Sequence, residues 1–192
     1  MTRSTFITGL CALALAGCSP AGAEAENNVK GNAPMKKALV VYFSATGTTR
    51  AKAETLAKAI GADLKEIVPA VRYTDADLDW HDSKSRSSVE MANKASRPAI
   101  ASKVENIADY DTVFVGFPIW WYVAPTIVNT FLEAHDFAGK RIFPFFTSGG
   151  SGAGRTNEYL KPSAPNSIFA EPKNLTGASE RSIRAWAEPL VR

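Results

Sequence analysis

The sequence predicts an α/β domain built on a parallel sheet that is covered by helices on both faces. The apolar runs 38–43 and 112–117 lack polar alternation, as is typical of strands buried on both faces. Segments with helical spacing of apolar residues lie between such runs, and strands that alternate with helices form parallel sheets. The 192 residues, of which 45% are hydrophobic and 21% charged, are enough for one such domain and few for two.

The elements follow one another in the order strand, helix, strand. The run 38–43 is the first expected strand. Apolar residues then recur with helical spacing from Thr48 to Ile60, where Gly61 is a typical helix stop. The segment 63–68 is more polar than the first strand, so it is expected to be a strand near an edge of the sheet.

The second half of the domain continues the alternation. The run 112–117 is a strongly buried strand, and Pro125 suits the first position of a helix with an apolar stripe. The next strand is 141–147, where Pro144 cannot donate to a ladder and predicts a bulge or an edge-like position. The remaining expected elements are a short helix at 155–160, a strand near 167–170 and a helix that begins at the cap Ser179.

Composition excludes several classes of protein. Two cysteines are too few for a disulfide framework, and His81 and His135 are too few for a histidine-rich metal site, so no metal is expected. The formal charge of +3 is small and evenly spread, which argues against nucleic acid as a partner. Outside the N-terminus no apolar stretch approaches the ~20 residues that a membrane span needs.

The N-terminus is typical of an export signal. Arg3 precedes the apolar run 6–16, and the sequence Leu-Ala-Gly-Cys at residues 15–18 resembles a bacterial lipobox, in which Cys18 receives the lipid. An ordinary signal peptide that is cut nearby is the alternative interpretation. Because Ser19 follows the cysteine, the resemblance implies sorting to the outer membrane of the cell envelope.

The predicted organisation therefore has three parts. Residues 1–17 are the lipoprotein signal peptide, residues 18–36 are a flexible tether with almost no core-forming side chains, and residues 37–192 are the folded domain. The expected contact with the membrane is through the lipid anchor alone.

Three connections carry residue types that are suited to ligand binding. They are expected at the carboxyl edge of the sheet, where parallel sheets bind ligands. Segment 44–50 carries four hydroxyls before a helix N-terminus, which favours a phosphate, although such residues also cap helices. Segment 117–125 carries two tryptophans and a tyrosine, which stack on planar ligands or simply pack. Segment 148–154 has four glycines, so its backbone can approach a flat group, although it could also be a plain surface loop.

Together these loops resemble the flavodoxin-like FMN-binding superfamily, in particular its short bacterial branch with Pro-Ile-Trp-Trp in the second loop. The resemblance implies a flavodoxin-like three-layer α/β sandwich with a five-stranded parallel sheet in the order 2-1-3-4-5. It also implies FMN as cofactor, with its phosphate on the first loop and its ring between the other two. The residues that it assigns to FMN are Ser44, Thr46, Gly47, Thr48, Thr49, Pro118, Ile119, Trp120, Trp121, Ser148, Gly149, Gly150, Ser151 and Gly152.

The function expected from this resemblance is electron transfer, or reduction of a small acceptor such as a quinone, through bound FMN. The chain would then be an FMN-dependent oxidoreductase; its redox donor and acceptor and its oligomeric state are open. A membrane-tethered, non-catalytic binding protein for another phosphorylated ligand is the alternative. A hydrolase is less favoured, because no Gly-x-Ser-x-Gly elbow follows a strand.

Two features depart from electron-carrier flavodoxins. Such carriers are strongly acidic, whereas this chain is slightly basic. A long connection, 69–101, follows the second strand and carries Trp80 and His81. Long irregular loops are often lids, so this one would form a substrate wall over the flavin. A solvated insertion with a short helix near 87–95 is the alternative.

Overall fold

The structure is a computed structural model that describes residues 37–101 and 103–192. The signal peptide, the lipidation site Cys18 and the tether lie outside the described residues. The strands are β1 (Lys37–Tyr42), β2 (Asp63–Glu66), β3 (Tyr110–Pro118), β4 (Arg141–Thr147), β5 (Ile168–Phe169) and β6 (Lys173–Asn174). The helices are α1 (Thr48–Ile60), α2 (Arg86–Ala92), α3 (Ile127–Glu133), α4 (Thr156–Leu160) and α5 (Glu180–Ala187).

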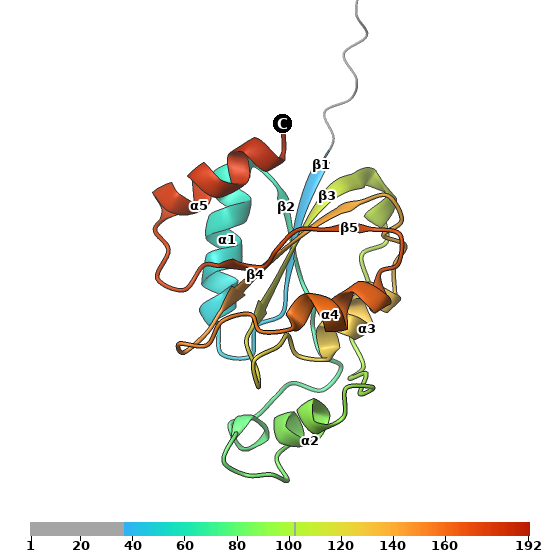
Figure 1. Ribbon diagram of the computed structural model, residues 1–192, viewed down its shortest axis with the longest axis vertical. Coiled ribbons are helices and arrows are strands. Elements are labelled where there is room, and N and C mark those ends of the chain that lie inside the picture. The colour runs from blue at the N-terminus through green and yellow to red at the C-terminus, as the bar shows by residue number, and fades with distance from the viewer. Residues whose placement is uncertain (1–36, 102) are drawn as a thin grey trace, which may run out of the picture. The chain divides into compact units, whose positions relative to one another are not determined.

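The strands form one parallel sheet in the order β2-β1-β3-β4-β5, with the short β6 also paired to β4. The predicted flavodoxin-like order is therefore confirmed. Figure 1 shows α1 and α5 on one side of the sheet and α3 and α4 on the other. The more polar β2 lies at one edge, as its sequence indicated.

Two hydrophobic layers enclose the sheet, because successive residues of the central strands point to opposite faces. Leu39, Val41 and Phe43 pack into one layer with α3, whereas Val40 and Tyr42 pack into the other with α1 and α5. The burial on both faces explains why the central strands are almost continuously apolar.

The ends of the helices follow local sequence signals. Helix α1 spans the predicted residues and ends at Gly61, which has φ 66° and donates its N–H to the carbonyl of Ala57. The hydroxyl of Ser179 accepts from Ser182 N–H and caps α5, as expected. Pro125 was expected as the first helical residue, but α3 begins two residues later, at Ile127.

Pro144 is accommodated by a gap in the neighbouring strand. The carbonyls of Ile142 and Phe146 accept from Ala170 and Leu175, so this side of β4 faces β5 and then β6. Pro144 faces the same side, between the ends of these two short strands, and its pairing with β3 runs through without a bulge. The edge-like alternative is therefore the correct one, and β6 is an element that the sequence did not predict.

Contacts divide the chain into residues 1–33 and residues 34–192, and both hydrophobic layers belong to the second unit. Within the described residues no helix is both long and apolar enough to cross a membrane. The connection between β2 and β3 carries α2 and extends beyond the carboxyl ends of the strands, at the bottom of Figure 1. We call residues 69–101 the lid segment.

Candidate functional site

The first loop presents the N-terminus of α1 to solvent. Gly47 has φ 89° and precedes the first helical residue, and its N–H donates to the hydroxyl of Ser44 at 3.1 Å. No side chain in the described structure caps this helix, and its first turn has no acidic residue. The N–H groups of the first turn and the exposed hydroxyls of Thr46 and Thr48 therefore form a set of donors suited to a phosphate.

Two residues of this loop have structural roles as well. Thr49 is buried, and its hydroxyl shares a hydrogen bond of 2.8 Å with the hydroxyl of Thr147 at the end of β4. Arg50 pairs with both carboxylate oxygens of Glu66, each at 2.9 Å. The cation nearest the loop is thus already paired, and an anion here would be held mainly by N–H and hydroxyl donors.

The second loop is a tight aromatic hairpin. Trp120 and Val123 exchange both backbone hydrogen bonds, at 2.9 and 3.1 Å, around Trp121 and Tyr122. These two residues have φ 44° and 64°, a conformation that type I′ turns require and that bulky side chains rarely adopt. Strain of this kind persists only where neighbouring contacts fix it, and it is found preferentially at functional sites.

The two tryptophans have different surroundings. Trp120 is partly buried, and its ring lies edge-on to Phe43 and Tyr73, with centroid distances of 5.6 and 5.5 Å. Trp121 is 41% exposed and Tyr122 is 69% exposed. The hairpin therefore anchors one ring in the core and displays two at the surface.

The third loop closes on itself and packs against the hairpin. Ser148 donates its hydroxyl to the carbonyl of Ser151 at 2.6 Å and accepts from Gly150 N–H at 3.2 Å. A Cβ built on Gly154 would overlap the carbonyl oxygen of Tyr122. Glycine at this position thus lets the third loop approach the strained backbone of the second.

These loops surround a cavity of about 690 Å³, within the range of small-molecule sites. Ten of the fourteen predicted FMN-binding residues line it: Ser44, Thr46, Thr48, Thr49, Pro118, Ile119, Trp120, Trp121, Gly149 and Ser151. Gly47, Ser148, Gly150 and Gly152 are absent from the lining. Gly47 and Ser148 instead shape the turns that hold the lining residues in place.

The lid segment forms the remaining wall. Leu78, Trp80 and Ser87 line the cavity together with Ala45 and Tyr122. The sequence pointed to Trp80 through the length of the connection, but nothing in its pattern distinguished Leu78 or Ser87. The short helix that the alternative interpretation expected near 87–95 is present as α2 (Arg86–Ala92).

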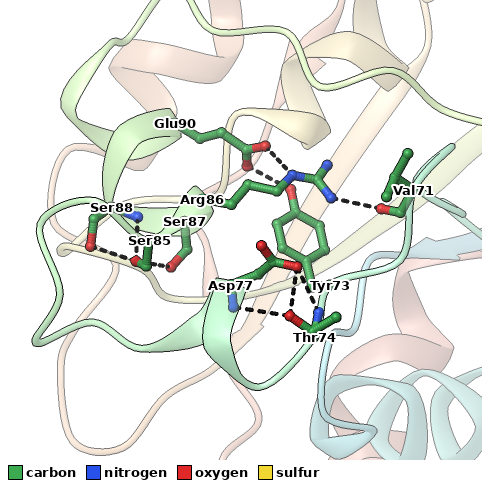
Figure 2. Close-up of polar contacts among 9 residues, drawn as sticks. All are labelled: Val71, Tyr73, Thr74, Asp77, Ser85, Arg86, Ser87, Ser88 and Glu90. Atoms are coloured by element: carbon green, nitrogen blue, oxygen red, sulfur yellow. Dashed lines mark hydrogen bonds and ion pairs between the residues drawn. The ribbon is translucent and has the colours of Figure 1, made fainter.

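A polar cluster holds the lid segment in shape (Figure 2). The Tyr73 hydroxyl donates to Glu90 at 2.6 Å, and the guanidinium of Arg86 donates to the other carboxylate oxygen at 2.7 Å. Arg86 also lies 3.9 Å over the Tyr73 ring and donates to the carbonyl of Val71. Burial, together with the carboxylate of Glu90, raises the pKa of Tyr73, so this phenol stays protonated and remains a donor.

Neither histidine is placed to act as a base in this cavity. His135 Nδ1 lies 2.8 Å from the carbonyl of Phe131, and Nε2 accepts from Val104 N–H, so both ring nitrogens are occupied by backbone groups. His81 packs against the ring of Trp80. Over the residues that the structure describes, no cluster of metal-ligating side chains occurs.

The donors and surfaces of the cavity fit FMN. An uncapped helix N-terminus with two exposed hydroxyls suits a phosphate monoester, and aromatic and aliphatic side chains with an open glycine loop suit a flat ring. A Cβ on Gly149 would meet no atom within 4 Å, so space remains beside the backbone there.

Comparison with known proteins gives a family and close structural relatives. The profile of the family described as Flavodoxin matches residues 37–190. A provisionally named flavoprotein from Bacteroides eggerthii is 52% identical, with a TM-score of 0.76 over 81% of this chain and 98% of that chain. A similar protein from Bacteroides uniformis is 49% identical, with a TM-score of 0.76 over 80% of this chain and 98% of that chain. No curated protein matches the chain.

A more distant structure shares the fold. The flavoprotein from Lactobacillus acidophilus, solved in complex with FMN, is 22% identical and has a TM-score of 0.60. The match covers 72% of this chain and 93% of that chain.

Proposed function

The chain belongs to the flavodoxin family, and on this premise we propose that it binds FMN in the cavity and transfers electrons through it to a small acceptor such as a quinone. When bound, FMN supplies reversible two-electron chemistry, by which a quinone and two protons become a hydroquinone while an electron donor of the cell envelope is oxidised. The chain's own residues bind and orient the flavin and limit its contact with water.

The observation that carries this proposal is the meeting of all three loops at one cavity. Donors for a phosphate lie at Thr46, Thr48 and the first turn of α1, and apolar and aromatic walls lie at Ile119 and Trp121. The Lactobacillus acidophilus flavoprotein binds FMN on the same fold, which supports the same cofactor here. Backbone N–H groups near Gly149 would favour negative charge on the ring edge that faces them.

The phosphate assignment is tested by removing hydroxyls without changing side-chain shape. Thr46→Val and Thr48→Val together should weaken FMN binding at least about tenfold, because hydrogen bonds to a charged group contribute about 1.5–3 kcal/mol each. Both side chains are exposed, so the fold should be unaffected. Thr55→Val, on the same helix but outside the cavity lining, is the matched control.

Riboflavin makes this test specific. It carries the same ring as FMN but no phosphate, so its affinity should be nearly the same in the double variant and the parent chain. Equal loss of FMN and riboflavin affinity would show that the two hydroxyls do not hold the phosphate. Isothermal titration of residues 34–192 with each flavin gives both constants.

We further propose that Cys18 is lipidated and anchors the domain to the cell envelope, most simply at the outer membrane. The motif Leu-Ala-Gly-Cys at residues 15–18 supports this. Radiolabelled palmitate should be incorporated into the full chain and should be absent from Cys18→Ser. Equal labelling of Cys11→Ser and the parent chain would place the modification at Cys18, whereas labelling of Cys18→Ser would contradict the assignment.

A further inference from the structure

The exposed aromatic side chains gather at one place on the described surface. Among the large apolar residues that the structure describes, six are exposed, and the three aromatic ones are Trp80, Trp121 and Tyr122. All three line the cavity, although they come from two segments far apart in the sequence. Exposed aromatic surface is costly unless a ligand covers it, so this concentration indicates a binding surface.

Trp80 packs against its neighbour His81 on the lid segment, and most of its side chain is exposed. Its indole packs against the imidazole of His81 with a centroid distance of 3.5 Å and an interplanar angle of 35°. The carboxylate of Asp79 accepts from His81 N–H at 2.9 Å and fixes the turn between them. The side chain of Trp80 nevertheless remains 67% exposed.

The base of the lid segment is attached to the cavity wall. The ring of Tyr73 contacts Phe43 and Trp120, and its hydroxyl donates to Glu90. Arg86 joins the same carboxylate and covers the Tyr73 ring, as Figure 2 shows. The base of the lid segment is therefore attached to the cavity wall, and Trp80 lines the cavity from this segment.

The stretch of sequence that carries Trp80 is acidic. Residues 74–82 contain four aspartates and no lysine or arginine. Three of these carboxylates accept backbone N–H groups within the lid segment, as the contacts of Asp77, Asp79 and Asp82 show. An anionic ligand would be repelled here, whereas an uncharged or cationic ligand would not.

We propose that Trp80, which lines the same cavity as Trp121 and Tyr122 of the second loop, forms a stacking site at the cavity mouth for a planar aromatic acceptor without negative charge. This inference rests on the proposed function, since the acceptor would approach the flavin from the lid side. Trp80 is then a residue that determines acceptor specificity, while FMN itself is held by the three loops.

The test measures binding in the absence of turnover. The protein used is the domain, residues 34–192, which contains both hydrophobic layers. The Bacteroides eggerthii protein matches 81% of this chain over 98% of its own length, so a chain of about this size folds without the N-terminal segment. The domain is loaded with FMN, kept oxidised without any electron donor, and titrated with menadione, an uncharged planar naphthoquinone, by calorimetry. Trp80→Ala should weaken menadione binding about 2- to 10-fold, the range expected for loss of one aromatic stacking contact.

Two variants serve as controls. Trp80→Phe retains a ring and should keep most of the menadione affinity. Val89→Ala removes an exposed apolar side chain of the same lid segment that does not line the cavity, and it should leave the affinity unchanged. A naphthoquinone sulfonate should bind more weakly than menadione to the parent domain, with the difference shrinking as salt is added.

The outcomes separate this inference from the proposed function. Failure of the parent domain to take up FMN would refute both at the first step. Normal FMN uptake with the same menadione affinity in Trp80→Ala and the parent would refute the stacking site alone. A large loss of FMN affinity in Trp80→Ala would assign Trp80 to the flavin and would also overturn the inference. Normal FMN affinity, weaker menadione binding in Trp80→Ala and near-normal binding in Trp80→Phe would support it.

Discussion

Gly154 joins two of the three loops, and replacing it tests whether their contact shapes the cavity. Its φ of 51° alone makes alanine unfavourable, by about 1–2 kcal/mol. A Cβ there would also overlap the carbonyl oxygen of Tyr122 and lie 3.3 Å from its carbonyl carbon, so one loop would have to move. Overpacking of this kind costs about 1–3 kcal/mol, which gives a total of about 2–5 kcal/mol for Gly154→Ala.

Gly139→Ala is a matched control. Gly139 has φ 73°, and a Cβ there would meet no atom within 4 Å, so only the conformational cost of about 1–2 kcal/mol applies. Urea unfolding of residues 34–192 measures both variants, and FMN titration then reports on the cavity. Gly154→Ala should be the less stable variant by about 1–3 kcal/mol and should bind FMN at least about tenfold more weakly, whereas Gly139→Ala should bind it normally.

The reasoning would be refuted by equal unfolding free energies for the two variants. It would also be refuted by unchanged FMN affinity in Gly154→Ala, because the contact with the aromatic hairpin would then have no part in shaping the site.

Three further predictions concern the scaffold. Burial lowers the pKa of His135 below its usual 6.5, so the unfolded chain takes up a proton at a higher pH than the folded chain does. The stability that this histidine contributes is therefore complete above about pH 6.5 and is lost as the pH falls below that value. Protonation of the ring breaks the hydrogen bond from Val104 N–H. Urea unfolding across this range should show a smaller pH dependence in His135→Gln than in the parent, and parallel curves would contradict the prediction. A Cβ on Gly116 would fall within the buried ring of Phe145, with Cε1 only 2.9 Å away. Gly116→Ala should therefore lower the free energy of unfolding by about 1–3 kcal/mol in the same assay. A loss below about 0.5 kcal/mol would show that the ring shifts freely. Ser179→Ala removes the cap of α5 and should lower the free energy of unfolding by about 1 kcal/mol, whereas Ser179→Asp should retain most of that stability. An alanine variant as stable as the parent would show that this cap is dispensable.

The fold was largely predictable because its signals are local or strongly periodic. Helix α1 was predicted with its observed bounds, since an apolar face and a terminal glycine mark it clearly. The strand order came from the family resemblance and is confirmed. The break between β5 and β6 depends instead on which side of β4 Pro144 faces, a tertiary property that propensity does not encode.

Residues of the candidate site were predictable where the residue types within a single loop indicate ligand binding. Thr48 at the start of α1 and Trp121 in the second loop were both predicted from their loop sequences, and the structure brings them to one cavity. Ser148 was grouped with them, but its hydroxyl closes the third loop internally, which the sequence does not indicate. Leu78 and Ser87 reach the cavity only because the lid segment folds back, through contacts between side chains that are distant in sequence.

FMN titration of the domain, residues 34–192, followed by visible absorption and tryptophan fluorescence, tests the central claim most directly. Saturable uptake of one FMN per chain is predicted, with a shifted flavin spectrum and quenched tryptophan emission, because Trp120 and Trp121 line the cavity. Absence of uptake would contradict both the cofactor assignment and the redox function. The cavity would then belong to a different phosphorylated ligand, held by a tethered binding protein without turnover.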